Sequence, residues 1–308
     1  MMARYRAFAA AKVNLFLHVG PARTDGRHPL DSLVVFAGRE ACDVLDVAEG
    51  PADRLEVSGP FAGALDDPAE NLVSAALSRL RGQARISPER DRPVVFSLAK
   101  YLPIAAGLGG GSANAAAALR VLTRDVFDLP VRVAKDLAPQ LGGDVCVCLE
   151  NVPSWMRGDG DDVEPVRPGR LRTCLTRGGD GGLPAVLVNS GVPCPTGPVF
   201  RAYDRLGPRR LDLVSPPSPT DRSALYDWLD GATRNDLQAA AIALVPEIEG
   251  VLADVSACSG ARLVRLSGSG ATVFALFDAM DDALLAQSAL TRAHPGWWVR
   301  ATRLGEGL

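Results

Sequence analysis

Long apolar runs are missing from this sequence of 308 residues, although 47% of its residues are hydrophobic. No uninterrupted apolar stretch approaches the roughly 18 residues that a helix needs to cross a bilayer. The first residues lead directly into alternating, strand-like sequence, without the apolar centre of a secretory signal. We therefore expect a cytoplasmic protein that does not act at a membrane.

Residues that commonly bind metals or form disulfides are few and scattered. The chain has three histidines and six cysteines, with no C-x-x-C pair and no histidine at metal-ligand spacing from a cysteine. This pattern predicts reduced, mostly buried thiols and does not favour a structural zinc site.

Concentrated positive charge is also missing. The 33 lysines and arginines are dispersed and the net charge is −3, so no basic stripe marks a nucleic-acid interface. Only three of the basic residues are lysines, namely Lys12, Lys100 and Lys135. We expect a small molecule as the partner, and a monomer or weak homodimer.

The chain does contain strand-like and helix-like segments in alternation, which predicts an α+β fold. Its length favours two domains, residues 1–162 and 163–308, divided where glycines and prolines interrupt the pattern. The first two strands are expected to pair with each other. Strands are predicted at 5–9, 13–19, 32–36, 43–47, 54–57, 94–98, 145–149, 185–189, 261–266, 272–277 and 297–301, and helices at 70–80, 113–122, 198–205, 235–244, 246–257 and 281–291.

A glycine-rich loop precedes the alanine-rich helix at 113–122. Its consecutive glycines allow backbone N–H groups to converge on an anion, and the following helix adds the positive end of its dipole. No lysine follows as in a P-loop, and a flexible turn is the alternative. The loop consists of Pro103, Ile104, Ala105, Ala106, Gly107, Leu108, Gly109, Gly110, Gly111, Ser112 and Ala113. We interpret it as a phosphate-binding loop, in which Ser112 either caps the helix or faces a phosphate or magnesium ion.

A phosphate loop without its own lysine requires charge and a base from elsewhere. Lys12 begins a strongly apolar strand and is the candidate for the charge, and Asn14 shares its strand face. Asp144 follows two glycines and precedes the predicted strand at 145–149, which makes it the candidate base. An ordinary strand-end lysine and a turn aspartate are the alternatives.

A second small-residue loop, 266–271, lies between two strands of the second half. It permits close backbone approach to a ligand or to the other half, and a tight structural turn is equally compatible with the sequence. His18 alternates with apolar residues and is interpreted as a buried, satisfied histidine. His28 lies in a polar loop, where a ligand contact and a surface role are equally compatible with the sequence.

Together and in this order, these segments resemble the GHMP kinases over essentially the full chain. The resemblance implies an N-terminal half similar to the second domain of ribosomal protein S5 and a ferredoxin-like C-terminal half, with ATP and magnesium bound between them. It also implies that Lys12 and Asp144 are the catalytic pair. The substrate is expected to carry a cytidine diphosphate group, and the matching substrate positions are Asn14, Arg27, His28, Thr196 and Phe200.

Several residues depart from the family pattern. Arg27 replaces a tyrosine that stacks on cytosine, and its guanidinium plane can stack on a base in the same way. Ala10 and Cys146 each replace a proline, and Ala113 replaces a serine. We expect reduced activity rather than a different function. Another GHMP kinase, of the homoserine or mevalonate type, and a non-catalytic metabolite-binding relative remain alternatives.

Overall fold

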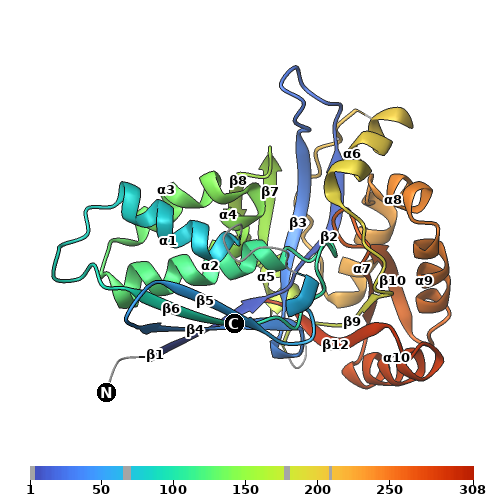
Figure 1. The fold of residues 1–308 in the computed structure, drawn as a ribbon. Helices are drawn as coiled ribbons and strands as arrows, with labels where there is room; N and C mark the ends of the chain where they lie inside the picture. The colour runs from blue at the N-terminus through green and yellow to red at the C-terminus, as the bar shows by residue number, and fades with distance from the viewer. Residues whose placement is uncertain (1–3, 65–70, 177–180, 208–209) are drawn as a thin grey trace.

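The computed structural model describes residues 4–64, 71–176, 181–207 and 210–308, and it has the predicted α+β architecture (Figure 1). The strands are β1 (Arg4–Ala10), β2 (Lys12–Val19), β3 (Leu30–Ala37), β4 (Cys42–Glu49), β5 (Arg54–Ser58), β6 (Val94–Ala99), β7 (Ser154–Gly158), β8 (Asp162–Pro165), β9 (Leu183–Asn189), β10 (Ala261–Leu266), β11 (Val273–Phe277) and β12 (Trp298–Gly305). The α-helices are α1 (Leu72–Gln83), α2 (Gly110–Val121), α3 (Val131–Leu141), α4 (Gly143–Glu150), α5 (Arg170–Thr176), α6 (Thr196–Arg205), α7 (Arg222–Ala232), α8 (Gln238–Leu244), α9 (Glu247–Ser256) and α10 (Met280–Ala293).

The smaller sheet has the strand order β1-β4-β6-β5. Helices α1, α2 and α3 lie over one face of it (Figure 1). Apolar side chains of the sheet, such as Leu45 and Phe96, pack against the alanines of α2 in one hydrophobic cluster. This layer fixes the start of α2, where the glycine-rich loop ends.

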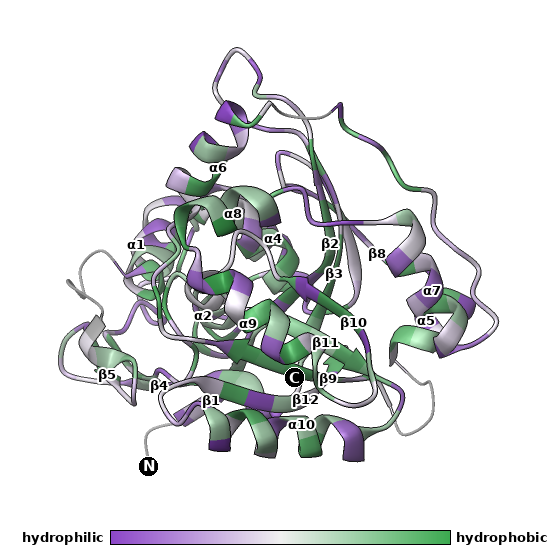
Figure 2. Ribbon diagram, turned by 90° about the vertical axis from the view of Figure 1, so that its right-hand side faces the viewer, coloured by the Kyte–Doolittle hydropathy of each residue, from purple (hydrophilic) through white to green (hydrophobic). Residues whose placement is uncertain are grey.

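The larger sheet runs through both halves of the chain in the order β10-β11-β9-β12-β3-β7-β8, with β2 paired to β3. The halves meet where β12 pairs with β3, at Leu304 opposite Ala37. In Figure 2 the strands β2, β3 and β9 are largely hydrophobic. One buried cluster combines Phe16 of β2 with Leu187 of β9 and Phe274 of β11, so the two halves share a core.

The predicted strand at 145–149 is wrong, because this segment is helix α4. Its alternating valines and cysteines are typical of a strand, yet Val145, Val147 and Cys148 are all buried. Helix α4 packs against α2 and α3, and the small alanines of α2 allow a helix to approach closely. Tertiary packing therefore overrides the local β propensity, and Asp144 lies in the first turn of a helix.

The predicted pairing of the first two strands is also wrong. Strand β1 pairs with β4 in the small sheet, and β2 pairs with β3 in the large one. The chain changes sheets at Ala11, whose N–H donates to Ala41 O and whose carbonyl accepts from the Ala37 N–H. Alternation identified both strands, but it carries no information about their partners.

Helices α3, α5 and α7 and the β7–β8 hairpin were not predicted, although the hairpin falls within the glycine-rich sequence at the proposed domain boundary. The division at residue 162 stays a proposal. The other predicted elements are present within a few residues of the expected bounds. Residue 70, the predicted start of the first helix, lies outside the described residues, and α1 begins at Leu72 with Asn71 as its N-cap. Across the described ranges, no helix has the length and apolarity to cross a bilayer.

Candidate active site

The glycine-rich loop adopts a conformation that requires glycine at two positions. Gly107 and Gly109 have φ values of +73° and +62°, in the left-handed region. A Cβ at Gly107 would lie 2.1 Å from Ser267 O. Gly109 is the N-cap residue of α2. The N–H groups in the first turn of this helix therefore have no partner within the helix and are available to a ligand. The loop therefore has the geometry of an anion site, and Ser112 lies within the first turn of α2 rather than at its cap.

Strand β2 places Lys12 directly against this loop. The backbone N–H of Lys12 donates to Leu108 O at 2.9 Å. A Cβ at Gly109 would lie 2.6 Å from Lys12 Cγ, so the lysine stem occupies the space that glycine leaves free. The position of the ammonium group thus depends on the loop conformation.

Lys12 and Asp144 meet at this point. Lys12 Nζ lies 3.1 Å from Asp144 Oδ2, and it donates to Asn14 Oδ1 at 2.8 Å. The Lys12 side chain is 6% exposed and that of Asp144 is 34% exposed. Asn14 in turn donates through Nδ2 to Ser32 Oγ at 2.8 Å. An almost buried cation therefore faces a carboxylate that is open to a ligand.

A cavity of about 600 Å³ opens beside this pair. Its wall also contains Gly268 and Ser269 of the second small-residue loop. The predicted site residues on its wall are Lys12, Asn14, residues 103–107 and 109–112, Asp144, Thr196 and Phe200. Residues that the sequence predicted separately, from both halves of the chain, therefore surround one cavity.

Leu108 and Ala113 are predicted loop residues that lie outside the cavity wall. Both are buried, Ala113 in the same hydrophobic cluster as the smaller sheet and Leu108 in the cluster that the two halves share. Their side chains anchor the loop to the core, so only their backbone can take part in phosphate binding.

The second small-residue loop supports the first, as predicted for a close backbone approach. Ser267 Oγ donates to Gly107 O at 3.0 Å, and the N–H of Thr272 donates to Ala106 O at 3.1 Å. The hydroxyls of Ser269 and Thr196 lie 2.9 Å apart. Thr196 is the first residue of α6, so this loop links the glycine-rich loop to α6.

His28 and Phe200 are brought together, with their ring centroids 4.8 Å apart. Phe200 of α6 lines the cavity, whereas His28 packs against it from outside the wall. His28 Nε2 lies 2.8 Å from Asp204 Oδ1. The β2–β3 hairpin, which carries His28, rises beside α6 in Figure 1.

Arg27 is not part of the cavity wall to which Phe200 belongs. Its Nη1 lies 3.5 Å from Asp159 Oδ2, and the side chain is 68% exposed. Arg23 contacts the other oxygen of Asp159 at 2.5 Å. Asp159 lines the cavity, so two arginines meet one carboxylate at its rim. Stacking of Arg27 on a base stays a prediction.

Sequence reasoning did not assign a role to several residues on the cavity wall. Lys100 is 3% exposed, and its Nζ lies 2.5 Å from Asp43 Oδ2. Asn114 is 2% exposed, and its Oδ1 accepts no hydrogen bond from any described residue. The scarcity of lysine marked Lys100 as unusual, but no local pattern identifies its partner Asp43. Asn114, on the first turns of α2, also lies on the wall.

The cysteines lie in environments that suit packing. The thiols of all six are free, and four of them are buried. Burial raises the pKa of Cys148 on α4 to about 12, so it is a thiol at neutral pH and a poor nucleophile. Within the described ranges, no three histidine, cysteine or acidic residues are grouped as a metal site would require.

Comparisons with known proteins agree with this geometry. The family models described as "GHMP kinases N terminal domain" and "GHMP kinases C terminal" match residues 71–151 and 220–296. The 4-diphosphocytidyl-2-C-methyl-D-erythritol kinase of Hyphomonas neptunium is 46% identical over 305 residues, which cover 97% of this chain and 96% of that protein. The kinase of the same name from Methylobacterium radiotolerans is 46% identical over 305 residues, covering 96% and 97%.

Solved structures are similar over the whole chain. A crystal structure of 4-(cytidine 5'-diphospho)-2C-methyl-D-erythritol kinase has 30% identity and a TM-score of 0.72, and covers 98% of this chain and 100% of its own. Homoserine kinase from Cytophaga hutchinsonii has 18% identity and a TM-score of 0.65, with coverages of 99% and 96%. At that identity the likeness concerns the fold alone.

Proposed function

The chain belongs to the 4-diphosphocytidyl-2-C-methyl-D-erythritol kinases, a family of GHMP kinases, and on this premise we propose that Lys12 and Asp144 are its catalytic pair. The acceptor is the 2-hydroxyl of 4-diphosphocytidyl-2-C-methyl-D-erythritol and the donor is ATP. The reaction is a step of the non-mevalonate route to isoprenoid precursors.

The observation that carries this proposal is the Lys12–Asp144 contact of 3.1 Å beside the glycine-rich loop. Asp144 takes the proton of the hydroxyl, whose oxygen attacks the γ-phosphorus of ATP. The bond to the bridging β–γ oxygen breaks, and ADP leaves without a covalent enzyme intermediate. The ammonium of Lys12 stabilises the negative charge that develops on the acceptor oxygen and the transferred group.

Magnesium fits the oxygen atoms around the loop. Mg²⁺ prefers oxygen ligands and is commonly bound by one or two carboxylates together with substrate phosphates. The carboxylate of Asp144, the hydroxyl of Ser112 and the unpartnered Oδ1 of Asn114 all belong to residues on the cavity wall. These residues would hold the ion, which neutralises part of the charge on the β- and γ-phosphates when it is bound.

The other end of the cavity is assigned to the cytidine diphosphate part of the substrate. Phe200 stacks on cytosine, and His28, packed against Phe200, donates a hydrogen bond to the edge of the base when its ring turns from outside the wall into the cavity. Asn14 and Thr196 orient the erythritol and its phosphates. Arg27 supplies the second stacking surface when it leaves Asp159, which its exposed side chain permits.

The test is an assay of ATP consumption with the cytidyl substrate, for the wild type, Asp144→Asn and a control, Asp136→Asn. Asp136 is exposed on the neighbouring helix α3. Asp144→Asn should lower kcat by about 10²- to 10⁴-fold, because a general base contributes that much, and Asp136→Asn should not. If neither the wild type nor Asp144→Asn consumes ATP, although both still bind it, the result would support a metabolite-binding relative. Turnover of homoserine or mevalonate in place of the cytidyl substrate would support another GHMP kinase.

A further inference from the structure

A short segment of the second half, residues 233–237, is inserted between β2 and the second small-residue loop. Leu17 of β2 forms a parallel bridge with Asn235. The N–H of Leu17 donates to Arg234 O at 2.9 Å, and the N–H of Asp236 donates to Leu17 O at 2.9 Å. The segment is therefore bonded to the same strand that carries Lys12 and Asn14.

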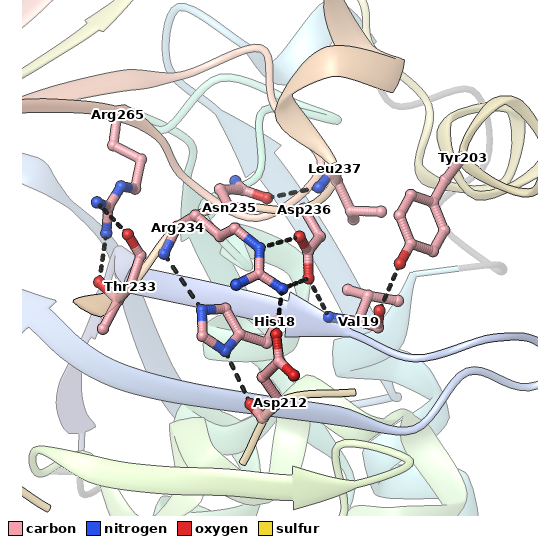
Figure 3. A network of polar contacts seen from close by, with 10 residues as sticks. All are labelled: His18, Val19, Tyr203, Asp212, Thr233, Arg234, Asn235, Asp236, Leu237 and Arg265. Atoms are coloured by element: carbon pink, nitrogen blue, oxygen red, sulfur yellow. Dashed lines mark hydrogen bonds and ion pairs between the residues drawn. The ribbon is translucent and has the colours of Figure 1, made fainter. Parts of the chain in front are cut away.

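Side chains hold this segment in place from both sides, as Figure 3 shows. The N–H of Arg234 donates to His18 Nε2 at 3.2 Å, while His18 Nδ1 donates to Asp212 O at 2.9 Å. Asp236 accepts from the Val19 N–H at 2.9 Å and from Arg234 Nε at 2.6 Å. The predicted buried, satisfied state of His18 is confirmed, and the backbone around residue 235 has little freedom.

The side chain of Asn235 points from this fixed segment to the small-residue loop. Its Nδ2 donates to Leu266 O and to Gly268 O, both at 2.8 Å. Its Oδ1 accepts from the Leu237 N–H at 2.9 Å. Asn235 is 8% exposed, so these bonds are shielded from water. All the hydrogen-bonding groups of the carboxamide are used within the protein.

The loop that Asn235 holds is the one that supports the site. Ser267 Oγ donates to Gly107 O, and it accepts from the Asn14 N–H at 3.3 Å. A Cβ at Gly268 would lie 3.1 Å from Gly107 O and 3.3 Å from Asn14 Oδ1. A displacement of this loop would therefore move the phosphate loop relative to Asn14 and Lys12.

We propose that Asn235 is a positioning residue for phosphoryl transfer, which fixes the phosphate loop relative to Lys12 through the loop 266–270. This inference rests on the proposed function. Asn235 lies behind the cavity wall and acts through Ser267 and Gly268. An ångström of misalignment between reacting groups can lower a rate about 10²-fold, whereas the N–H groups that bind phosphate are retained.

The test uses Asn235→Asp, which keeps the size of the side chain and the acceptor for Leu237. The variant places a carboxylate oxygen against two carbonyl oxygens in place of a donor. We expect kcat to fall about tenfold or more while the Kd for ADP changes less than about threefold. The matched control is Tyr226→Phe on α7, which removes a buried hydrogen bond of 2.9 Å to Phe277 O of β11. It should lower the melting temperature but leave kcat unchanged.

Two results would overturn the positioning role. One is a kcat for Asn235→Asp equal to that of Tyr226→Phe at a similar loss of melting temperature. If Asn235→Asp does not fold, Ser267→Ala tests the same link, because it removes only the hydroxyl between the two loops. The second overturning result is a kcat of Ser267→Ala equal to that of the wild type. Failure of the wild type to phosphorylate the cytidyl substrate is a separate outcome, which overturns the proposed function.

Discussion

The ammonium group of Lys12 and the carboxylate of Asp144 lie 3.1 Å apart, although they come from strand β2 and from the first turn of helix α4. The glycine-rich loop lies against the lysine, and α4 packs beside α2, the helix that this loop begins. Because the loop contacts β2 and begins the helix that packs against α4, the geometry of the pair depends on small residues that have no chemistry of their own.

Gly109→Ala tests this dependence. The substitution adds a Cβ at 2.6 Å from Lys12 Cγ and places a side chain at a φ of +62°, which costs about 1–2 kcal/mol. We expect lower kcat together with a lower melting temperature. Gly82→Ala on α1 is the control, since among the described residues its added Cβ would meet nothing within 4 Å beyond its chain neighbours and the backbone of its own helix. It should stabilise the protein by about 0.5–1 kcal/mol; unchanged kcat in Gly109→Ala would contradict the role of this glycine.

Phe200→Ala tests the assignment of the cytidine end. Stacking of a base on an aromatic ring contributes about 1–3 kcal/mol, so KM for the cytidyl substrate should rise about 5- to 150-fold. KM for ATP should change little, because Phe200 belongs to α6 rather than to the phosphate loop. Arg201→Ala, at the exposed neighbouring position, is the matched control. If KM rises more for ATP than for the cytidyl substrate, the cytosine does not bind at Phe200.

Asp43→Ala tests the buried ion pair beneath the loop. Asp43 accepts from Lys100 Nζ and from the N–H groups of Tyr101 and Leu102 at 2.7 and 2.9 Å. Removal of one partner leaves a buried charge, so we expect a loss of about 3–5 kcal/mol in the free energy of unfolding, measured in urea. The exposed pair of Arg124 and Asp125 serves as the comparison, and Arg124→Ala should cost less than about 1 kcal/mol. A loss below about 1 kcal/mol for Asp43→Ala would contradict this account.

The pH dependence of stability can be tested at Asp46. A hydrogen bond from the Arg6 guanidinium, opposed by burial and supported by Arg4, lowers the pKa of Asp46. A carboxylate whose pKa is lower in the folded than in the unfolded protein stabilises the fold at pH values above its unfolded pKa of about 3.9. This stabilisation is lost as the pH falls through the folded pKa. The free energy of unfolding of the wild type should therefore exceed that of Asp46→Asn at pH 6, and the difference should shrink below about pH 4. Arg6→Met should reduce the same difference, whereas a constant difference across this range would refute the assignment.

Much of the site could be predicted because its residues have distinctive local patterns. Consecutive glycines before an alanine-rich helix predict a phosphate-binding loop, and a lone lysine at the start of an apolar strand makes Lys12 a candidate; both lie on the wall of the same cavity. Asn14 follows from the two-residue period of the strand, and its contact with Lys12 confirms the shared face.

The remaining features depend on contacts between distant segments. The helical state of α4 is set by packing against α2, which a pattern of alternating valine and cysteine does not reveal. The partner of Lys100, which follows β6, is Asp43 on β4, and the partner of Arg27 is Asp159 in the β7–β8 turn. Such pairs are formed by the fold, so periodicity along the chain carries no information about them.

The core that contains Phe16, Leu187 and Phe274 also bears on protein engineering. A chimera that joins residues 1–162 of this chain to the second half of a relative would keep β2 but replace the strands that pack on it. The side chains of β2 would have to match those of the replaced strands in volume, because voids and overlaps both destabilise a close-packed interior. The two halves are therefore not interchangeable parts, and exchanging them would require repacking the surfaces where they meet.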